Sequence, residues 1–481
     1  MKELRVKIKT LTPLWTGGVD GTMDRIHETG ILGSLRWWYE ALVRGLGGEA
    51  CDPTSDGKSG TSKRCPDDNG HYCDVCAVFG ATGLRRAFRL EGPAWWNAEH
   101  HNRLTVKVNQ HRRHRGWYLG RGYLGEGELA LRALRLPENW QTDDLWQTLY
   151  FALRLISCWA GIGAKSQQGY GVVQTEADKF ALDIDRAFGV VEDLKNRSHR
   201  RGIVSSNCLP AIDQFFFVKV RLLFHNESPQ EWLNQTAQLE LNDEVEWYFQ
   251  KNSITSVLPL APVVRYYLRA LIREHIKHNG KPNAPARWHL MGVINGLWHS
   301  PDYGKIQEIN KWYCPVCNSE WNRRPSRSEH RNCGGRLKKK AHCLNCSHEW
   351  ASLHDAMSDG STRKVERQRS LINVSHAYPV NDGQWEFRIW GWIPNHLPDV
   401  SRATVLEKLQ KWLGVQQSRE RQWHDTATNQ NTLWNKIGLN EVQVCWFSKQ
   451  MAEDTVDFLK ALPTNCDTEP TEGSASAGGR A

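Results

Sequence analysis

The sequence predicts an α+β fold, because strand patterns and helix patterns alternate twice along its 481 residues. Both times the order is strand, helix, strand, strand, helix, strand, which is the βαββαβ order of a ferredoxin-like, RRM-like unit. A pair of C-x2-C motifs interrupts the second copy. At about 150 residues per domain, a chain of this length has room for more than one unit. We therefore expect two tandem ferredoxin-like units, at residues 1–178 and 213–463.

In the first unit, "LRVKIKTL" alternates apolar and basic residues, as a half-buried strand does. The segment "GSLRWWYEALVRGLG" has helical spacing and ends on glycine, and "LRRAFRLEG" and "ELALRALRL" are the next two strand candidates. Leu145, Leu149, Leu153 and Ile156 recur at three- and four-residue steps, which predicts a helix with a wide apolar stripe. The β-branched "YGVVQTE" then closes the unit as a strand.

The second unit repeats this order. Residues 179–212 are charged and show little apolar periodicity, so they are the expected linker. A strand "FFFVKVRLLF" and a helix "VVRYYLRALIREHIKH" follow. The segments "RSLINVSHAYPV" and "QWEFRIWGWI" should pair across the turn "NDG", and "ATVLEKLQKWLGV" and "EVQVCWFS" supply the last helix and strand. Residues 464–481 have the composition of a flexible tail.

The charge of the chain favours an anionic partner. Lys and Arg number 62 against 53 Asp and Glu, a formal net charge of +9, which suits nucleic acid. The first residues, "MKELRVKIKT", lack the apolar core of a signal peptide, and no apolar run reaches the roughly 18 residues of a membrane span. We expect a cytoplasmic protein that does not contact membrane.

The 13 cysteines point to metal, because structural disulfides are rare in a reducing compartment. Four of them form two C-x2-C pairs and predict a zinc ribbon inserted at about residues 307–360, with His330 and Cys333 between the pairs as alternative ligands. Four thiolates would close a tetrahedral, structural Zn²⁺ site that has no open position for catalysis. The four are Cys314, Cys317, Cys343 and Cys346.

A second cysteine cluster at residues 51–76 has a single C-x2-C and predicts a further zinc site less specifically. Its thiols are Cys51, Cys65, Cys73 and Cys76, and His71 competes with Cys51 for the fourth position.

The segment "AGIGAKSQQGYGVVQ", residues 160–174, is a glycine-rich loop. It leaves a helix and enters a strand, so it does not aim a helix N-terminus at a phosphate as a dinucleotide-binding loop does. The loop could instead let its bare backbone approach a polyanion, with Lys165 and Ser166 projecting from it. The alternative is an ordinary glycine turn that caps the helix.

A second basic segment, "KVNQHRRHRGWYLGRGY", interleaves cations with aromatic rings. Rings stack on any base and cations meet the backbone, so Arg112, Arg113 and Arg115 are candidate contacts for single-stranded nucleic acid. A solvated loop would have the same composition.

These motifs together resemble the RAMP superfamily of CRISPR-associated RNA-binding proteins. The glycines of the loop, Gly161, Gly163, Gly169 and Gly171, are similar to that superfamily's glycine-rich signature. More narrowly, "TPLWTGG", "ILGSLRWWYEALV" and "INVSHAYPV…WEFRIWGWIP" resemble subunit one of the type III-B Cmr effector. The resemblance implies a subunit of an antiviral ribonucleoprotein that contacts CRISPR RNA, target RNA or both, and docks on other RAMP subunits.

The same resemblance implies roles for Arg36 and Trp37. Arg36 could pair with a phosphate while Trp37 stacks on a base. Because adjacent residues face different ways on a helix, one of Trp37 and Trp38 should pack against the sheet instead.

Two alternatives differ in class. The loop at residues 17–30 carries Asp20, Asp24 and His27, which could serve a RAMP-type endoribonuclease through a metal or a general base. Asp in a glycine-rich loop is more often turn chemistry, and the resemblance assigns target cutting to a different subunit, so we expect no catalysis. A zinc-ribbon protein that binds duplex DNA or a protein without guide RNA is the other alternative.

Overall fold

The computed structural model of the chain divides into two compact units. The first comprises Met1–Leu268, Ile372–His396 and Ser401–Ala481, and the second comprises Arg269–Leu371 and Leu397–Val400. The structure describes every residue except 1, 19, 54–63, 102–103, 109–115, 199–208, 225–227, 242–248, 251–252, 255–256, 294–295, 300–303, 327–329, 331–335, 344–348, 360–361, 366–367, 382, 417–421, 427–431, 453 and 465–481.

The first unit begins with a four-stranded sheet in the order β2-β5-β1-β6, in which all neighbours are antiparallel. Leu4, Val6 and Ile8 are fully buried while the residues between them face outward, so the alternation in the sequence is confirmed. The strands are β1 (Glu3–Thr10), β2 (Phe88–His101), β5 (Gly122–Ala133) and β6 (Val173–Ala177).

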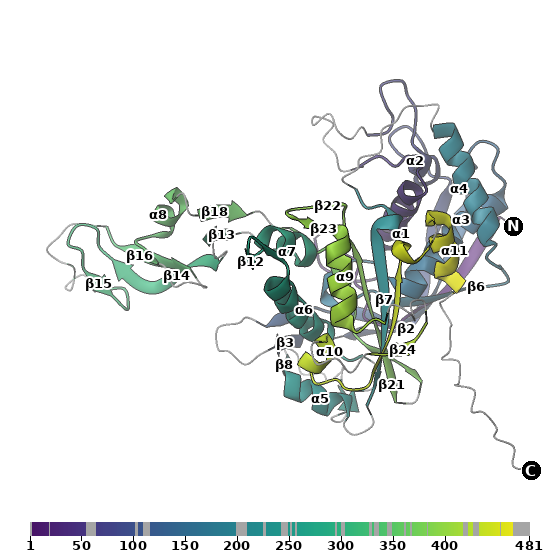
Figure 1. Cartoon of the computed structure of the whole chain (residues 1–481). Coiled ribbons are helices and arrows are strands. Elements are labelled where there is room, and N and C mark those ends of the chain that lie inside the picture. Colours follow the sequence, from purple (N-terminus) through teal and green to yellow (C-terminus); the bar gives the residue numbers. More distant parts are fainter. Residues whose placement is uncertain are drawn as a thin grey trace, which may run out of the picture. The chain divides into compact units, whose positions relative to one another are not determined.

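Two long helices, α1 (Glu28–Gly45) and α3 (Thr142–Trp159), connect these strands (Figure 1). The side chain of Asp144 accepts a hydrogen bond from the backbone N–H of Gln141, which helps to fix the start of α3. The elements of this sheet follow the strand–helix–strand–strand–helix–strand order expected from the sequence, but the chain adds the short α2 (Asp74–Phe79) after α1 and two strands that pair elsewhere between β2 and β5.

The segment expected as a linker contains a helix, α4 (Ile184–Ser198). Phe188 of α4 packs edge-on against Phe151 of α3, with the ring centroids 5.2 Å apart. The helix was missed because its apolar stripe is short and surrounded by charged residues, whereas burial against α3 stabilises it.

A second sheet has the order β19-β21-β7-β25-β24, with β20 also paired to β21. Its first four strands repeat the order of the first sheet, and the hairpin predicted across "NDG" is present as the antiparallel pairing of β21 with β19 and β20. The strands are β7 (Phe215–Leu223), β19 (Ile372–Val374), β20 (Tyr378–Asn381), β21 (Gln384–Trp392), β24 (His424–Asp425) and β25 (Val442–Ser448).

Strand β7 is buried on both faces, which explains its unbroken apolar start. On one face Phe215 and Phe217 contact Trp38 of α1 and Trp159 of α3, so these helices pack on the second sheet as well as on the first. On the other face Phe216 stacks on Trp446 of β25 at 5.1 Å. The mixed α+β fold with antiparallel sheets is thus confirmed.

The remaining elements of the first unit surround these sheets. They are α5 (Pro229–Thr236), α9 (Arg402–Leu413), α10 (Leu433–Lys436), α11 (Thr455–Thr464), the first half of α6 (Ala261–His275), the three-stranded sheet of β4 (Trp117–Leu119), β3 (Leu104–Val108) and β8 (Ala237–Leu241), and the pair β9 (Phe249–Gln250) and β10 (Ser253–Ile254). The short strands β22 (His396–Leu397) and β23 (Val400–Ser401) pair with each other, and each begins or ends at the boundary of the first unit.

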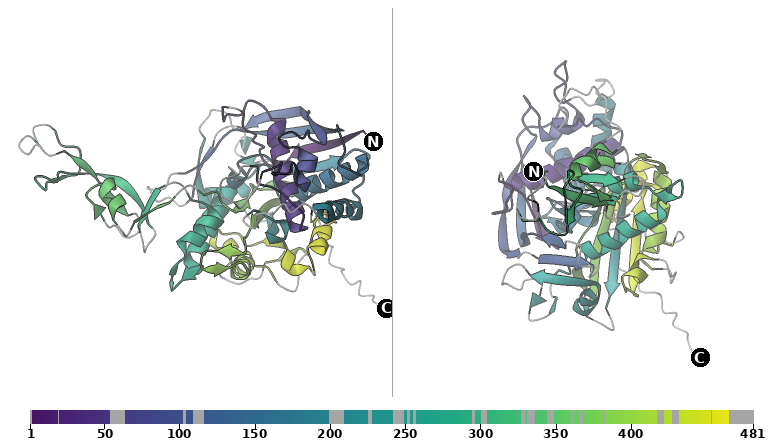
Figure 2. Two further views of the ribbon diagram at one scale, coloured as in Figure 1. Left: turned by 90° about the horizontal axis from the view of Figure 1, so that it is seen from above. Right: turned by 90° about the vertical axis from the view of Figure 1, so that its left-hand side faces the viewer.

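The second unit holds the end of α6, α7 (Ala284–Met291), α8 (Leu353–Ser358) and a sheet in the order β17-β16-β14-β13-β18, with β15 paired to β14. Strands β14 and β16 form a long ribbon that α8 accompanies (Figure 2). The strands are β11 (Lys277–His278), β12 (Lys281–Pro282), β13 (Gly296–His299), β14 (Gly304–Tyr313), β15 (Glu320–Trp321), β16 (Lys338–Cys343), β17 (Glu349–Trp350) and β18 (Thr362–Val365).

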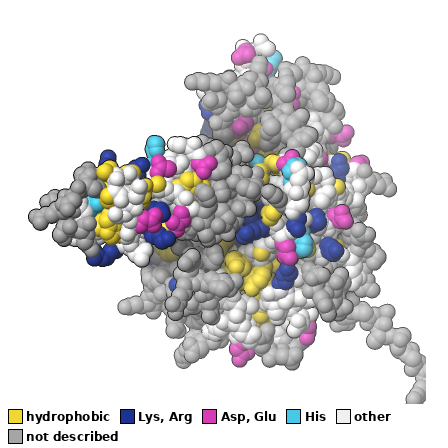
Figure 3. Space-filling view, turned by 60° about the vertical axis from the view of Figure 1, so that its left-hand side comes forward, with side chains coloured by type: hydrophobic (Ala, Val, Ile, Leu, Met, Phe, Trp, Pro, Cys, Tyr) yellow, Lys and Arg dark blue, Asp and Glu magenta, His cyan; other side chains and the backbone are white. Residues whose placement is uncertain are grey.

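The net positive charge does not form one continuous basic area on the face shown in Figure 3, where Lys and Arg side chains are interspersed with Asp and Glu. A nucleic-acid interface on this face would therefore depend on particular residues and not on a broad basic surface. Among the described helices, none is both long enough and apolar enough to cross a bilayer.

Candidate nucleic-acid interface and metal centre

The glycine-rich loop lies between α3 and β6 and is bound on one side by the loop that follows β1. The backbone N–H of Gly171 donates to the carbonyl of Pro13 at 2.9 Å, and that of Ala164 donates to the carbonyl of Trp15 at 2.8 Å. Ser34 of α1 accepts a further hydrogen bond from the N–H of Gly163, at 2.8 Å. These bonds hold the loop in a single conformation next to the "TPLWTGG" segment.

The other side of the loop contacts the second sheet. The N–H of His376 donates to the carbonyl of Gly169 at 3.0 Å, and Ser166 hydrogen-bonds Asn373 of β19 at 3.2 Å. Arg388 of β21 donates through Nη1 to the carbonyls of Ile156 and Ala160, which are the last turn of α3. The two sheets of the first unit therefore meet at this loop.

The backbone conformation and close packing of the loop explain why glycine occupies each signature position, without any ligand. Gly163, Gly169 and Gly171 have φ of +82°, +99° and +90°, in the region that favours glycine. A Cβ on Gly169 would lie 2.6 Å from the ring of His376, and a Cβ on Gly161 would lie 3.1 Å from the carbonyl oxygen of Gly171. The backbone of the loop thus approaches other protein atoms closely, and an approach of RNA to these glycines stays a prediction.

Lys165 is the cation that this loop presents. Its backbone is also left-handed, with φ of +63°, and the loop continues from it into the short 3-10 helix η1 (Ser166–Gln168). The Nζ atom lies 4.3 Å from the centroid of the Trp15 ring, a cation–π contact. No carboxylate among the described residues forms an ion pair with it, and partial burial lowers the pKa of Lys165. A half-buried ammonium group without a counter-charge is a suitable partner for a phosphate.

The helix residues implied by the resemblance take different positions. Trp38 is 2 % exposed and packs against Phe215 and Phe217 of β7. Trp37 is 41 % exposed, but its ring also lies edge-on to that of Phe215, with the centroids 5.8 Å apart, so stacking of Trp37 on a base stays a prediction. Arg36 hydrogen-bonds Glu40 at 2.9 Å, the carbonyl of Gly80 at 3.2 Å and Cys76 Sγ at 3.5 Å. To bind a phosphate, Arg36 would have to exchange these partners. Arg112, Arg113 and Arg115 lie outside the described residues.

The loop considered for nuclease chemistry is held by local hydrogen bonds. Asp20 accepts from the hydroxyl of Thr22 at 2.7 Å, and Asp24 Oδ1 lies 2.7 Å from His27 Nε2. Tyr123 donates to the carbonyl of Asp24. Among the described residues, Asp20 and Asp24 belong to no group that could jointly hold a metal ion, so their positions fit turn chemistry.

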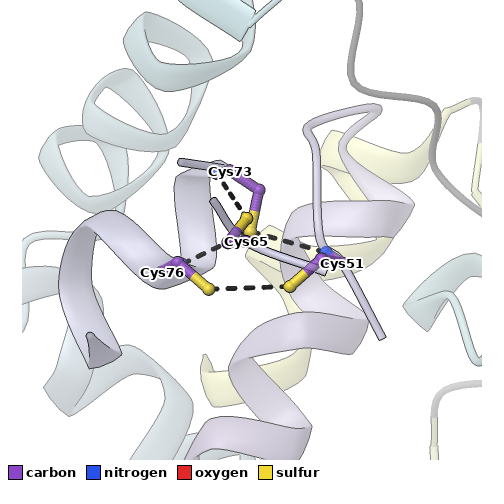
Figure 4. Close-up of side chains that lie close together, drawn as sticks. All are labelled: Cys51, Cys65, Cys73 and Cys76. Atoms are coloured by element: carbon purple, nitrogen blue, oxygen red, sulfur yellow. Dashed lines mark hydrogen bonds between the residues drawn. The ribbon is translucent and has the colours of Figure 1, made fainter. Parts of the chain in front are cut away.

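The cysteines at residues 51–76 converge on one point (Figure 4). All four sulfur atoms lie within 4.8 Å of one another, and Cys51 Sγ is 3.6 Å from Cys76 Sγ. A tetrahedral zinc with Zn–S bonds of about 2.3 Å separates its sulfurs by about 3.8 Å, so this set fits the ion. His71 is not in the group, and it lies 3.4 Å from Asp67 instead. The cluster, which the sequence supported less specifically, is the more complete of the two.

The surroundings of this cysteine cluster are those of thiolate ligands. Backbone N–H groups donate to two of the sulfurs: Cys73 to Cys65 Sγ at 3.1 Å, and both Cys51 and Cys76 to Cys73 Sγ at 3.4 Å. The guanidinium of Arg36 adds positive charge beside Cys76. All four cysteines are buried, and Cys73 also caps the start of α2. Groups that donate hydrogen bonds to the sulfurs in this way orient the ligands and offset their charge.

The described part of the ribbon brings together two of the four cysteines that the sequence predicts as ligands. The described donors that lie within 4.8 Å of one another are Cys314, Cys317 and His330. In the register of β14 with β16, Tyr313 lies opposite Lys338, five residues before Cys343. At about 3.3 Å per residue, the backbone of Cys343 therefore lies roughly 17 Å or more from that of Cys314, too far for the two residues to share an ion. The side chain of Cys343, and Cys333 and Cys346, lie outside the described residues.

A protein-family model matches the part of the chain that contains the glycine loop. Residues 7–174 match the model of the RAMP superfamily, from β1 through the glycine loop to the start of β6. This segment is a RAMP domain. The resemblance inferred from the motifs is therefore confirmed for residues 7–174, and the RAMP domain contains Trp15, Lys165 and the cysteine cluster at residues 51–76.

Solved structures also resemble this chain, whereas no curated protein matches it. Cmr1 from Pyrococcus furiosus, in its apo form, is 13 % identical, with 83 % of this chain and 91 % of that chain covered and a TM-score of 0.32. A chain from the type III-B Cmr-beta complex bound to cognate target RNA is 11 % identical. The match covers 85 % of this chain and 99 % of that chain, with a TM-score of 0.36. A chain from the Cmr-beta complex with target RNA and AMPPnP, in the presence of ssDNA, is 12 % identical. The match covers 85 % of this chain and 98 % of that chain, with a TM-score of 0.36.

Proposed function

We propose that the chain is a non-catalytic, RNA-binding subunit of a type III-B CRISPR ribonucleoprotein effector in antiviral defence. It has two tandem ferredoxin-like RAMP units, of which the second carries a zinc ribbon. Its partners are CRISPR RNA, target RNA or both, and other RAMP subunits of the complex. The RAMP match supports the class of protein, and the motif resemblance to subunit one supports the assembly.

The observation that carries RNA binding is the placement of Lys165. Its ammonium group stands over the ring of Trp15 at the meeting of the two sheets, and no described carboxylate pairs with it. Tyr118 is half exposed on the neighbouring strand β4, and a Cβ on Gly120 would meet both Lys165 Nζ at 2.8 Å and Tyr118 at 4.0 Å. A cation flanked by two aromatic rings suits a single strand, because the cation meets a phosphate while a ring stacks on a base.

The metal centre has a structural role in this proposal. Four thiolates at Cys51, Cys65, Cys73 and Cys76 would hold a Zn²⁺ that joins the segment around residue 51 to α2, next to α1. Zinc held in this way supplies folding free energy and has no open position for a water or a substrate.

The proposal is tested by purifying the chain together with the other subunits of its effector and sequencing the RNA that accompanies it. We expect short RNAs that carry CRISPR repeat and spacer sequence, and a stable complex with at least one other RAMP subunit. Recovery of the chain alone, or with random cellular RNA only, would refute the assignment to a guided complex.

The endoribonuclease alternative depends on the contact between Asp24 and His27, which could pair a base with a group that orients it. We propose that neither residue is catalytic. Clean protein should not cut single-stranded RNA with Mg²⁺ or with EDTA. If cutting occurs and is lost in Asp24→Asn or His27→Gln, with the fold intact by circular dichroism, the nuclease alternative is right.

A further inference from the structure

The second unit contains a group of arginines near the end of α6. Arg269 and Arg273 lie one turn apart on α6, and Arg287 lies on α7. Arg269 donates through Nη2 to the carbonyl of Gly292, which ends α7, at 2.8 Å. This bond brings the guanidinium of Arg269 to α7, the helix that carries Arg287.

Arg287 is buried, and no described carboxylate forms an ion pair with it. It is 9 % exposed, and its Nε is fully enclosed and has no hydrogen-bond partner. Burial, together with the positive charges of Arg269 and Arg273, lowers the pKa of Arg287 to about 10. Arg269 and Arg273 thus oppose the positive charge of Arg287.

Acidic groups do not balance this charge in the described part of the unit. No described carboxylate forms an ion pair with Arg269, Arg273 or Arg287. The acid nearest in sequence, Glu274, lies 3.7 Å from His275. A buried cation that lacks a partner is costly, so an arrangement of this kind indicates an anion that the protein binds.

The surface beside the cluster can admit such an anion. An open hollow of about 350 Å³ is lined by Arg273 and Lys277 together with Ala270, Glu274, Gly280 and Pro282. Arg273 and Lys277 are exposed there, and a Cβ at Gly280 would meet nothing within 4 Å. Planar guanidinium groups bind phosphate oxygens in pairs, and Lys277 adds a point charge at the rim.

We propose that Arg269, Arg273 and Arg287 form a second site, which binds a backbone phosphate of single-stranded RNA. The inference rests on the proposed function, because the RAMP domain makes RNA the polyanion to expect. It adds that RNA contacts the second unit as well as the glycine loop. A free phosphate ion would satisfy the same guanidinium groups, and the experiment below distinguishes the two sources.

The test uses the full chain and a fluorescent 20-nucleotide single-stranded RNA, with affinity measured by anisotropy over a range of KCl concentrations. Arg273→Gln is the main variant, because Arg273 is exposed and its loss should leave folding intact. It should weaken binding by roughly fivefold and lower the salt slope by about 0.7, the value for one lost phosphate contact on a single strand. Arg287→Gln should lower the slope similarly, and Arg85→Gln, exposed and without a described ion pair, is the control.

The outcomes separate the two proposals. If Arg273→Gln leaves the affinity and slope unchanged while Lys165→Ala reduces both, the second site is refuted and the proposed function stands. If both arginine variants weaken binding and Lys165→Ala does not, the second site stands and the loop site is wrong. If inorganic phosphate raises the melting temperature of the parent chain but not of Arg273→Gln, while RNA binding is equal in both, the site binds free phosphate and the proposal of an RNA contact is overturned.

A crosslinking experiment keeps the proposal testable should Arg287→Gln fail to fold. RNA with 4-thiouridine at each position in turn is crosslinked to the parent chain, and the adducts are mapped by mass spectrometry. We expect adducts in residues 269–292. Adducts confined to the RAMP domain, at every position of the label, would contradict the proposal.

Discussion

Arg388 donates a hydrogen bond of 3.1 Å to the carbonyl oxygen of Ala160, the residue at the end of α3 from which the glycine loop starts. Arg388 is 4 % exposed and belongs to a buried row that includes Glu386, Lys219 and Arg221. Burial alone would raise the pKa of Glu386, but the charges of Lys219 and Arg388 outweigh it and keep that pKa lowered. The second sheet thus fixes the geometry of a loop in the segment that matches the RAMP model.

Arg388→Met should therefore destabilise the first unit strongly. The change removes the donor to the carbonyl of Ala160 and to the hydroxyl oxygen of Tyr378, and one of two donors to the carbonyl of Ile156. It also removes a cation next to buried Glu386. We expect a loss of about 3 kcal/mol in the free energy of unfolding, measured in urea. Arg132→Met, which breaks an exposed ion pair with Glu3, is the control and should cost little. Equal losses in the two variants would contradict this role of Arg388.

Stability should vary with pH through the side chain of His376, the residue whose backbone N–H donates a hydrogen bond to the carbonyl of Gly169. Burial lowers the pKa of His376 from its ordinary 6.5 to about 3, so the folded state keeps the ring neutral. Below pH 6.5 the unfolded chain gains a proton that the folded chain does not, and stability falls by about 1.4 kcal/mol per pH unit until the pH approaches 3. Above pH 6.5 the ring contributes no slope.

This slope is measured from urea unfolding at pH 7.5, 6.0 and 5.0. His376→Gln should flatten the dependence by about one proton, and His278→Gln, at an exposed position, should leave it as in the parent chain. If His376→Gln and the parent chain lose the same stability on going to pH 5.0, His376 is not the residue responsible.

Two glycines should respond in opposite directions to alanine. Gly169→Ala places a methyl group 2.6 Å from the ring of His376 at φ of +99°, so we expect a loss of roughly 2 kcal/mol in unfolding free energy. A Cβ at Gly33, inside α1, would meet nothing within 4 Å, so Gly33→Ala should stabilise by about 0.5–1 kcal/mol. An unchanged stability in Gly169→Ala, with weakened RNA binding, would show that this glycine admits RNA after all.

Zinc content should follow the cysteine cluster at residues 51–76. Elemental analysis of the unchelated full chain should show one zinc equivalent lost in Cys76→Ser and none lost in Cys445→Ser, which changes a buried thiol outside any described donor group. Cys76→Ser should also lower the melting temperature, because metal binding and local folding are coupled. Equal zinc in Cys76→Ser and the parent chain would exclude the site.

The ribbon site is tested by the same measurement. His330→Gln and Cys317→Ser should each remove a second zinc equivalent, because these side chains lie with Cys314. The sequence instead predicts that Cys343→Ser removes it. Zinc lost in Cys343→Ser and retained in His330→Gln would favour the four-cysteine ribbon.

The long elements of this fold were predictable because each carries its own pattern. Strand β1 alternates buried and outward-facing residues, and α3 has an apolar stripe with the spacing of a helix and not of a strand. The sheet of β3, β4 and β8 was missed, since it joins short segments from residues 104–119 and 237–241, and local patterns do not encode such pairing.

The candidate site was predictable in part for the same reason. Four cysteines close in sequence were recognised, and the glycine loop and Lys165 were singled out. Arg388 and His376 were not, because their contacts span more than 200 residues and nothing in "WEFRIWGWIP" marks an arginine that caps a distant helix. Register likewise matters for Cys343: the C-x2-C spacing is compatible with a ribbon, but the pairing of β14 with β16 separates the backbones of Cys314 and Cys343.

The most direct test of the account is the salt dependence of RNA binding in Lys165→Ala beside Lys179→Ala. The two lysines share a left-handed backbone, with φ of +63° and +52°, so both substitutions change the main chain alike, but Lys179 is exposed and outside the loop. With the fluorescent single-stranded RNA, Lys165→Ala should lower the slope of log K against log salt by about 0.7 and weaken binding, whereas Lys179→Ala should change neither. Equal slopes and affinities in the parent chain and both variants, with folding intact, would mean that the glycine loop does not contact RNA.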